Sequence, residues 1–455
     1  MDKTLKTIVE FCTSHARQGA GEHLFLEFKR RWMDVAGVAL AALDQPAYLI
    51  AKDLALQTAP TGACQLLGTP QRTSAEMAAF ANGVLIRCLD GADTYPGGGG
   101  HPSDCWAALL ALAEENGNNL DELCCALNMA YAFYWYFFNA SALKDHGLDN
   151  TCYVGFASAL GGAHLLGLSP ERMAHALSMV VSSSLSLGVA RSGELSMWKS
   201  AASAHAAKQG VFAARLARLG MSAPHKPFEG DRGLWPLTKE IQLTFPPQAL
   251  RQTRQEEIAF ERAHMKYYLC EYHCQTPIMA ALELTAKLKD KTIATVNICT
   301  YRFALQEVAH GLEKWQPLTR ETADHSMPWS VASVLNGGEF RADIYEPNRL
   351  QDPKVQALAQ RITVREDPVL TQAFPESTPC VMEIKTLCGE THRAEVLRAL
   401  GHPKNPMSTV QVQAKFRDLS QRHLSPTQVD AFFDRLEILR PQDPVARLMH
   451  TMALD

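Results

Sequence analysis

Apolar residues recur at helical spacing through the first half of the chain. From Thr4 to about Gly220 they return every three to four residues, a period typical of packed helices. Ala, Gly and Ser are dense here, so helix backbones can approach closely. The pattern predicts a large all-helical domain with helices at residues 79–89, 106–115, 120–143, 154–168, 170–187 and 199–219.

The pattern changes after about residue 260. Alternating β-branched segments predict strands at 292–301, 361–366 and 380–387, accompanied by helices at 278–288 and 329–335. Residues 408–440 return to helical spacing, with Ser408 and Ser425 as N-caps. We therefore expect a mostly α fold with an inserted α+β domain. The helical domain comprises 1–262 and 408–455, and the smaller α+β lid domain comprises 263–407.

One segment raises the question of a membrane. Residues 123–143 carry no charge and are numerous enough to span a bilayer. Asn128, Asn139 and three tyrosines interrupt the segment, and its neighbouring helices are equally poor in charge. A helix buried inside a large helical domain explains this composition better.

Composition narrows the class of protein. Of 455 residues, 47% are hydrophobic and 20% charged, which excludes global disorder. The net charge is −4 without a long basic run, so a nucleic-acid or membrane partner is not expected. Twelve scattered cysteines and a polar start predict a cytoplasmic protein with free thiols. Cys270 and Cys274 have no second cysteine pair near them, so no metal site is predicted.

A glycine-rich loop is the first candidate for chemistry. Residues 89–104 contain four consecutive glycines and two prolines, together with Asp90, Asp93, Thr94 and His101. Such a loop lets backbone N–H groups approach a bound carboxylate. Alternatively, it is a connector whose polar residues form turns, with Ser103 or Asp104 capping the next helix.

Three further segments concentrate polar groups. Lys199 begins an Ala-rich helix, where it is either a site residue or a solvated surface lysine. Residues 264–276 interleave two His, one Lys and one Glu with aromatics, a mixture that can bind a carboxylate and move a proton, or simply pack at a domain junction. In residues 324–326, Asp, His and Ser are consecutive, so they cannot form a nucleophilic triad among themselves. We expect them to cap the helix that begins at Pro328.

Together these segments resemble one family. Asp-x-x-Asp-Thr-Tyr…Gly-His-Pro-Ser-Asp, Met-Trp-Lys, Lys-Tyr-Tyr…Glu-Tyr-His-x-Gln and Ala-Asp-His-Ser-x-Pro are similar, in this order, to the MmgE/PrpD family of 2-methylcitrate dehydratases and cis-aconitate decarboxylases. The resemblance covers almost the whole chain. It implies a helical domain with an inserted α+β lid, an active site in the cleft, a homodimer, and no metal or organic cofactor.

The resemblance also implies site residues. Asp90, Thr94 and His101 match the first active-site loop of the family, and Lys199 and Lys266 match its two lysines. A further catalytic histidine of the family is missing. The corresponding segment is Gly-Leu-Asp-Asn at 147–150, so its role has passed to Asp149 or Asn150, or the substrate differs.

One position separates the branches of the family. Where the resembling decarboxylases carry His, five residues after Lys266, this chain has Glu271, followed by Tyr272 and His273. Glu-Tyr-His-x-Gln resembles the dehydratase branch. We therefore expect a cofactor-independent hydro-lyase that removes water from a 2-methylcitrate-like tricarboxylate.

The expected roles follow from this reaction. The lysines stabilise charge next to a carboxylate, and His101 or His273 moves the proton at a pKa near ~6.5. Because cations crowded into a closed site rarely stabilise a fold, we expect the lysines to affect activity rather than stability. The expected catalytic residues are His101, Lys199, Lys266, His273 and Asp90, and the expected substrate-binding residues are Thr94, Asp93, Glu271 and Gln275.

Three alternatives remain at the level of sequence. The chain could decarboxylate cis-aconitate, or epimerise a dicarboxylate such as iminodisuccinate. The missing family histidine also allows a ligand-binding homologue that has lost the chemistry.

Overall fold

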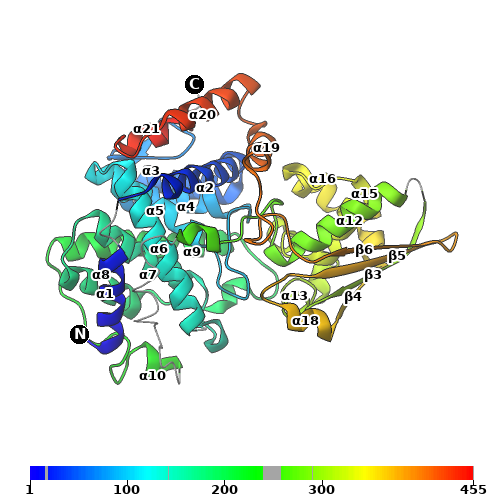
Figure 1. The fold of residues 1–455 in the computed structure, drawn as a ribbon, viewed down its shortest axis with the longest axis horizontal. Helices are drawn as coiled ribbons and strands as arrows, with labels where there is room; N and C mark the ends of the chain where they lie inside the picture. The colour runs from blue at the N-terminus through cyan, green and yellow to red at the C-terminus, as the bar shows by residue number, and fades with distance from the viewer. Residues whose placement is uncertain (16–18, 142, 239–257, 289–290, 454–455) are drawn as a thin grey trace.

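A large helical body and a smaller α+β part lie side by side (Figure 1). The computed structural model describes residues 1–15, 19–141, 143–238, 258–288 and 291–453. This arrangement confirms the predicted fold class. The helical body begins with α1 (Lys3–His15), α2 (Glu22–Ala41), α3 (Pro46–Thr58), α4 (Ala75–Arg87), α5 (Cys105–Asn116), α6 (Leu120–Ser141), α7 (Thr151–Leu165), α8 (Pro170–Ser183), α9 (Trp198–Arg218) and α10 (Leu234–Thr238), with β1 (Cys64–Gln65) and β2 (Arg72–Thr73) as a minimal hairpin.

The α+β part is built on one mixed sheet. Its strands are β3 (Ile293–Thr300), β4 (Ile362–Glu366), β5 (Cys380–Thr386) and β6 (Thr391–Val396), in the order β4-β3-β5-β6. β3 and β4 are parallel, and the other pairs are antiparallel. The helices of this part are α12 (Gln275–Leu288), α13 (Arg302–Val308), α14 (Arg320–Ala323), α15 (Met327–Gly337), α16 (Pro347–Leu350), α17 (Pro353–Ala359) and α18 (Pro368–Ala373).

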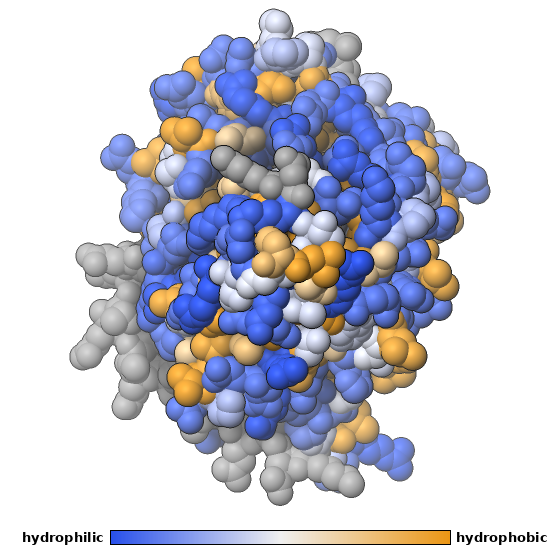
Figure 2. All heavy atoms as spheres, turned by 90° about the vertical axis from the view of Figure 1, so that its right-hand side faces the viewer, coloured by the Kyte–Doolittle hydropathy of each residue, from blue (hydrophilic) through white to orange (hydrophobic). Residues whose placement is uncertain are grey.

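Burial alternates along the strands of this sheet. Val296 and Ile298 of β3 and Met382 and Ile384 of β5 are buried, and α12 packs on β5 and β6. On the side of the molecule that lies at the right of Figure 1, apolar side chains are scattered among polar ones (Figure 2). The sheet therefore has a covered inner face and a solvated outer side.

The C-terminal helices return to the helical body (Figure 1). They are α19 (Thr409–Ser420), α20 (Pro426–Ile438) and α21 (Val445–His450), and α19 packs on α2. A Cβ at Gly37 would lie 3.2 Å from the ring of Phe416, so the small residue lets α19 approach closely. The α+β part thus lies between two helical segments in the sequence. The boundaries 262/263 and 407/408 stay a prediction.

Small residues also bring the central helices together. A Cβ at Gly83 of α4 would lie 2.8 Å from the Cβ of Ala204 on α9. One at Gly210 would lie 2.5 Å from the Cβ of Ser158 on α7. Larger side chains here would push α9 away from its neighbours, as expected from the composition of these segments.

The uncharged segment 123–143 falls mainly on α6, which is buried along most of its length. Among the described residues, none of the helices combines the length and apolar character needed to cross a bilayer. The twelve cysteines are free thiols, as predicted, and most are buried.

Candidate functional site

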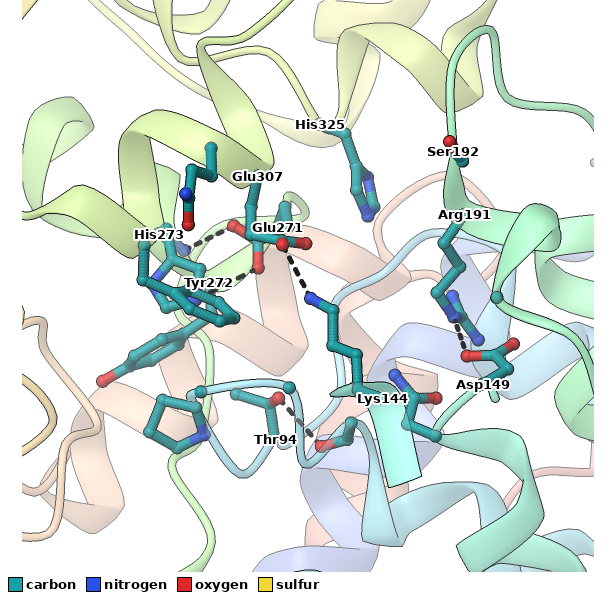
Figure 3. Close-up of a pocket in the computed structure, with 18 of the residues that line it drawn as sticks. Thr94, Lys144, Asp149, Arg191, Ser192, Glu271, Tyr272, His273, Glu307 and His325 are labelled. Atoms are coloured by element: carbon teal, nitrogen blue, oxygen red, sulfur yellow. Dashed lines mark hydrogen bonds and ion pairs between the residues drawn. The ribbon is translucent and has the colours of Figure 1, made fainter. Parts of the chain in front are cut away.

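A cavity of about 550 Å³ lies where the helical body meets the α+β part. Its wall includes Thr94 and His101 from the glycine-rich loop, and Glu271 and His273 from the segment before α12. Figure 3 shows Glu271 and His273 on one side of this cavity, and Asp149 and Arg191 on the other. Other charged or imidazole groups in the wall are Arg87, Lys144, Glu307, His310, Glu313, Lys314 and His325.

The glycine-rich loop folds back on itself beside the cavity. The N–H of Tyr95 donates to the carbonyl of Gly100 at 2.8 Å, and the Thr94 hydroxyl donates to the same oxygen at 2.9 Å. Gly100 has φ +80°, and a Cβ there would lie 2.5 Å from the Asn150 side chain. Only glycine fits this position. The loop therefore has a defined shape, which places His101 in the cavity wall.

Asp90 lies behind this wall at the centre of a ring of cations. Its Oδ1 accepts from Arg87 Nη1 at 2.5 Å and from Lys266 Nζ at 2.6 Å. Lys199 Nζ lies 3.8 Å from Oδ2, and both lysine side chains are fully buried. Asp90 itself has φ +52°, a strained backbone for a residue with a side chain. The structure thus unites three residues that the sequence proposed separately.

Lys199 is also paired with Asp324 from the start of the α15 segment. Its Nζ donates to Asp324 Oδ1 and Oδ2 at 2.8 and 2.9 Å. Arg320 Nη1 lies 3.4 Å from the same carboxylate. A solvated surface lysine is therefore excluded as the interpretation of Lys199.

The charged groups in this cluster shift one another's pKa values. Burial alone would raise the pKa of Asp90, but Arg87 and the two lysines outweigh it and hold the pKa well below its usual range. Asp324 is similarly lowered to a pKa of about 2, chiefly by Lys199 against the effect of burial. Burial lowers the pKa of Lys199, and Asp324 and Asp90 partly offset this. Both carboxylates are ionised at neutral pH, and the ring of cations exceeds them in charge.

Two imidazoles beside the cluster have a defined tautomer. His101 Nδ1 lies 2.9 Å from the carbonyl of Asp93, and His325 Nδ1 lies 2.5 Å from Asp324 Oδ1. Both partners only accept, so each Nδ1 carries the proton and each Nε2 is left with a lone pair. Burial, with the nearby cations, lowers the pKa of His101 well below its usual value and that of His325 to about 3. Both are neutral bases at pH 7, at a pKa lower than the sequence suggested.

His273 and Glu271 interact differently from the expectation. The Glu271 carboxylate accepts from the backbone N–H of His273 at 2.6 Å, whereas its distance to His273 Nε2 is 3.8 Å. The hydroxyl of Tyr301 is hydrogen-bonded to His273 Nδ1 instead. Burial, then Lys144 and Lys266, lowers the pKa of His273 to about 3. Glu271 therefore orients the backbone here, and Tyr301 orients the ring.

The carboxyl group of Glu271, in the cavity wall, has a raised pKa. Burial raises its pKa to about 7, although Lys266 acts in the opposite direction. A carboxyl group that titrates near neutrality can both donate and accept a proton at the working pH.

Two predicted substrate-binding residues do not reach the cavity. Asp93 Oδ2 accepts from the Tyr131 hydroxyl at 2.9 Å and lies 3.2 Å from Arg31, inside the helical body. Gln275 Oε1 accepts from the N–H groups of Tyr267 and Tyr268 at 3.2 and 3.1 Å. Asp93 Oδ1 also accepts from the backbone N–H of Ser103 at 3.0 Å, so both residues hold the backbone of site loops rather than face a ligand.

Asp104 is not the helix cap that we considered. Its side chain makes no capping hydrogen bond to α5 and lies 3.6 Å from Arg87 Nε. Ser326, in contrast, caps α15 by accepting from the N–H of Trp329 at 3.0 Å. Of the three consecutive residues at 324–326, only the serine has the predicted capping role, and the other two join the site.

Residues 147–150, where the resemblance led us to expect a histidine, line the cavity. Asp149 Oδ1 accepts from Arg191 Nε at 2.8 Å, and Asn150 contacts the glycine-rich loop. An ion pair thus occupies this side of the cavity (Figure 3).

Lys415 of α19 ties the site to the C-terminal helices. Its buried Nζ donates to Asp34 at 2.6 Å, to the carbonyl of Gly91 at 2.8 Å and to that of Lys266. We expect Lys415→Met to destabilise the protein by about 3–5 kcal/mol, because Asp34 is left as a buried unpaired charge. Chemical denaturation will measure this, with the exposed Lys6→Met as control. Equal unfolding free energies for Lys415→Met and wild type would contradict the prediction.

Among the described residues, one group has the geometry to hold a metal ion: Asp90, Asp324 and His325. Three of its four carboxylate oxygens already accept hydrogen bonds: Lys199 contacts both oxygens of Asp324, and Arg87 and Lys266 contact Oδ1 of Asp90. Oδ2 of Asp90 accepts no hydrogen bond and lies 3.8 Å from Lys199 Nζ. A divalent cation would add charge to a site that is already rich in cations. The group does not fit a metal.

Sequence reasoning missed several residues of the site. Arg87 lies one helical turn before Asp90, so its spacing was a usable signal. The sequence predicts a capping role for Asp324 and His325 because they precede Pro328, and it carries no local signal for their contact with Lys199. Arg191 and Lys314 carried no recognisable motif.

The chain matches known proteins over most of its length. Models of the MmgE/PrpD N-terminal domain and C-terminal domain match residues 6–241 and 268–436. The 2-methylcitrate dehydratase of Cupriavidus necator is 28% identical over 94% of this chain and 92% of its own length. That of Escherichia coli K12 is 27% identical over 75% and 73%. A 2-methylcitrate dehydratase-like protein of Aspergillus oryzae is 26% identical over 83% and 80%. With both domains matched in order along one chain, the protein belongs to the MmgE/PrpD family.

Proposed function

We propose that this protein is a hydro-lyase that removes water from a 2-methylcitrate-like hydroxy tricarboxylate without a cofactor. The observation that carries the proposal is the ring of Arg87, Lys199 and Lys266 around Asp90, next to a cavity with neutral imidazoles and the Glu271 carboxyl group. The names of the relatives in the family agree with this chemistry.

The first step is removal of a proton from the carbon next to a carboxylate. Nε2 of His101 carries the lone pair because Nδ1 donates to the Asp93 carbonyl, and this Nε2 lies 3.5 Å from Asp90 Oδ1. Nε2 of His325 is oriented in the same way by Asp324. We assign the proton transfer to His101, and His325 is a second base at the same cluster.

The charge that develops on the substrate carboxylate needs fixed cations. Lys199 and Lys266 are held by buried ion pairs and therefore need no reorganisation during the reaction. Asp90 keeps the three cations close together without neutralising them. Thr94, whose hydroxyl donates to the Gly100 carbonyl, lines the cavity, whereas Asp90, Lys199 and Lys266 lie behind its wall.

The hydroxyl group leaves as water when Glu271 donates a proton to it. The C–O bond breaks as the carbon–carbon double bond forms, and the proton taken by His101 balances the one given by Glu271. A pKa of about 7 lets a fraction of Glu271 carry the proton at neutral pH. His273, with its ring fixed by Tyr301, lies beside Glu271 and positions the leaving group.

Product analysis by NMR in D₂O tests the reaction class. We expect 2-methylcitrate or a close hydroxy tricarboxylate to lose water reversibly, with deuterium entering at the carbon that loses its proton. Itaconate and CO₂ as main products from cis-aconitate would overturn the dehydratase proposal. Exchange without a net product from a dicarboxylate would favour an epimerase, and no change in any acid would favour a binding protein.

We also propose that the protein acts as a homodimer through its helical body. Leu187 and Val189 in the segment before α9, and Trp198 at the start of α9, expose 64%, 74% and 53% of their surface. Grouped exposed apolar side chains favour a protein–protein contact. Analytical ultracentrifugation would reveal a monomer if this is wrong.

A further inference from the structure

The cations of the cavity wall are almost all paired. Lys144 Nζ lies 2.6 Å from Glu307, and Arg191 Nε lies 2.8 Å from Asp149. Arg87 is bonded to Asp90. Each of these side chains already has a carboxylate partner, so a ligand must compete with that partner for it.

Lys314 is the exception within the described part of the chain. It lines the same cavity and is only 6% exposed, yet its ammonium group has no hydrogen bond or ion pair there. Glu313 is its neighbour in the cavity wall, but the Glu313 carboxylate is turned back over Gly311, where a Cβ would lie 2.3 Å from its Oε1. A cation in the cavity wall without a carboxylate partner can pair with a bound anion directly.

The backbone of Lys314 is fixed. Its N–H donates to the carbonyl of Gly311 at 3.2 Å, and its carbonyl accepts from the hydroxyl of Ser326. Trp315, the next residue, donates through Nε1 to the carbonyl of Ile362 on β4 at 3.2 Å. Ser326 directly follows His325, so Lys314 is anchored next to the base-bearing segment of the site. A long cationic side chain on a fixed backbone is suited to bind an anionic ligand.

We propose that Lys314 binds a carboxylate of the substrate that does not take part in the proton transfer, and that it thereby selects acids with this extra carboxylate. That Lys314 selects among substrates rests on the proposed function. That Lys314 binds a carboxylate does not rest on it. In the proposed reaction, the cations around Asp90 stabilise the negative charge on the carboxylate next to the reacting carbon. Lys314 comes from the α+β part, on the segment before α14, and thus supplies a second, separate anion subsite.

Binding of unreactive acids tests the proposal independently of turnover. The probes are tricarballylate, which has three carboxylates and no hydroxyl, and glutarate, which lacks the central carboxylate. Isothermal titration calorimetry on the full chain compares wild type with Lys314→Met, Lys314→Arg and the control Lys354→Met, an exposed lysine of α17. We expect Lys314→Met to weaken tricarballylate binding about 10–100-fold. Lys314→Arg should retain most of the affinity, and Lys354→Met should match wild type. Glutarate should bind weakly and equally to all four proteins.

Thermal melting of the same proteins provides a second measurement. Because Lys314 has no anionic partner among the described residues, its replacement by Met should leave the melting temperature unchanged or raise it. Loss of folding in Lys314→Met would mean that the ammonium group has a structural partner, and would overturn the proposal.

The outcomes separate this proposal from the proposed function. Dehydration by the wild type, together with equal tricarballylate binding by wild type and Lys314→Met, would reject the role of Lys314 and leave the function standing. Lys314-dependent binding without turnover of any acid would reject the function and leave the subsite standing. Failure of wild type to bind tricarballylate at millimolar concentration would also reject the subsite.

Discussion

Lys199→Met is expected to lower kcat/KM at least ~100-fold, because the variant loses a cation that stabilises developing negative charge. It is also expected to lower the unfolding free energy by about 3–5 kcal/mol, since Asp324 then becomes a buried carboxylate without its main partner. This differs from the expectation drawn from sequence, which was that cations crowded in a closed site contribute little to stability. Steady-state kinetics and chemical denaturation measure the two effects.

A second substitution separates these effects. In Lys199→Met/Asp324→Asn both charges of the pair are removed, so stability should largely return while activity does not. Lys208→Met, on the same helix and half-buried, serves as a matched control. If Lys199→Met retained the wild-type kcat/KM, Lys199 would have a structural role and no catalytic one.

Local signals were enough to predict most of the helical body. Ser169, Ser408 and Ser425 each cap a helix, accepting from the N–H three residues later, as their positions before Pro or an apolar run indicated. The start of α4 was placed four residues late, because Ser74, which caps it, precedes the first strongly apolar positions.

The sheet was predicted less completely. β6 was missed because Thr-His-Arg-Ala-Glu-Val contains only two apolar residues, of which Ala394 is buried. It is an edge strand held by its pairing with β5, and such pairing leaves little trace in hydropathy. The parallel pairing of β3 and β4 likewise joins distant segments.

The site was predictable in its residue types and not in its partnerships. Asp90 and Asp93 are three residues apart and look equivalent in the sequence. The left-handed backbone at Asp90 and the turn after it send one toward the lysines and the other toward Arg31. Lys199 and Asp324 are 125 residues apart, so only the fold brings them together. Through this pairing Asp324, which the sequence predicts as a helix cap, joins the charged cluster around Asp90.

Glu271→Gln is expected to slow dehydration about 100-fold and to change the pH dependence of kcat. Burial raises the pKa of Glu271 to about 7, so the protonated acid that the leaving hydroxyl needs is present below that pH and lost above it. In wild type, kcat should therefore fall as pH rises through about 7. The neutral amide cannot titrate or donate in the same way, so Glu271→Gln should lose this limb.

His273→Asn gives the matching test on the neighbouring ring. The variant removes the ring that Tyr301 holds beside Glu271, and we expect it to abolish turnover. The pKa of His273 is lowered to about 3, so this ring contributes no limb to the wild-type profile between pH 5 and 9. The measurement is kcat against pH across this range for wild type and Glu271→Gln, with a single assay for residual turnover of His273→Asn. A limb near pH 7 that persists in Glu271→Gln would assign the titration to another group and remove Glu271 as the acid.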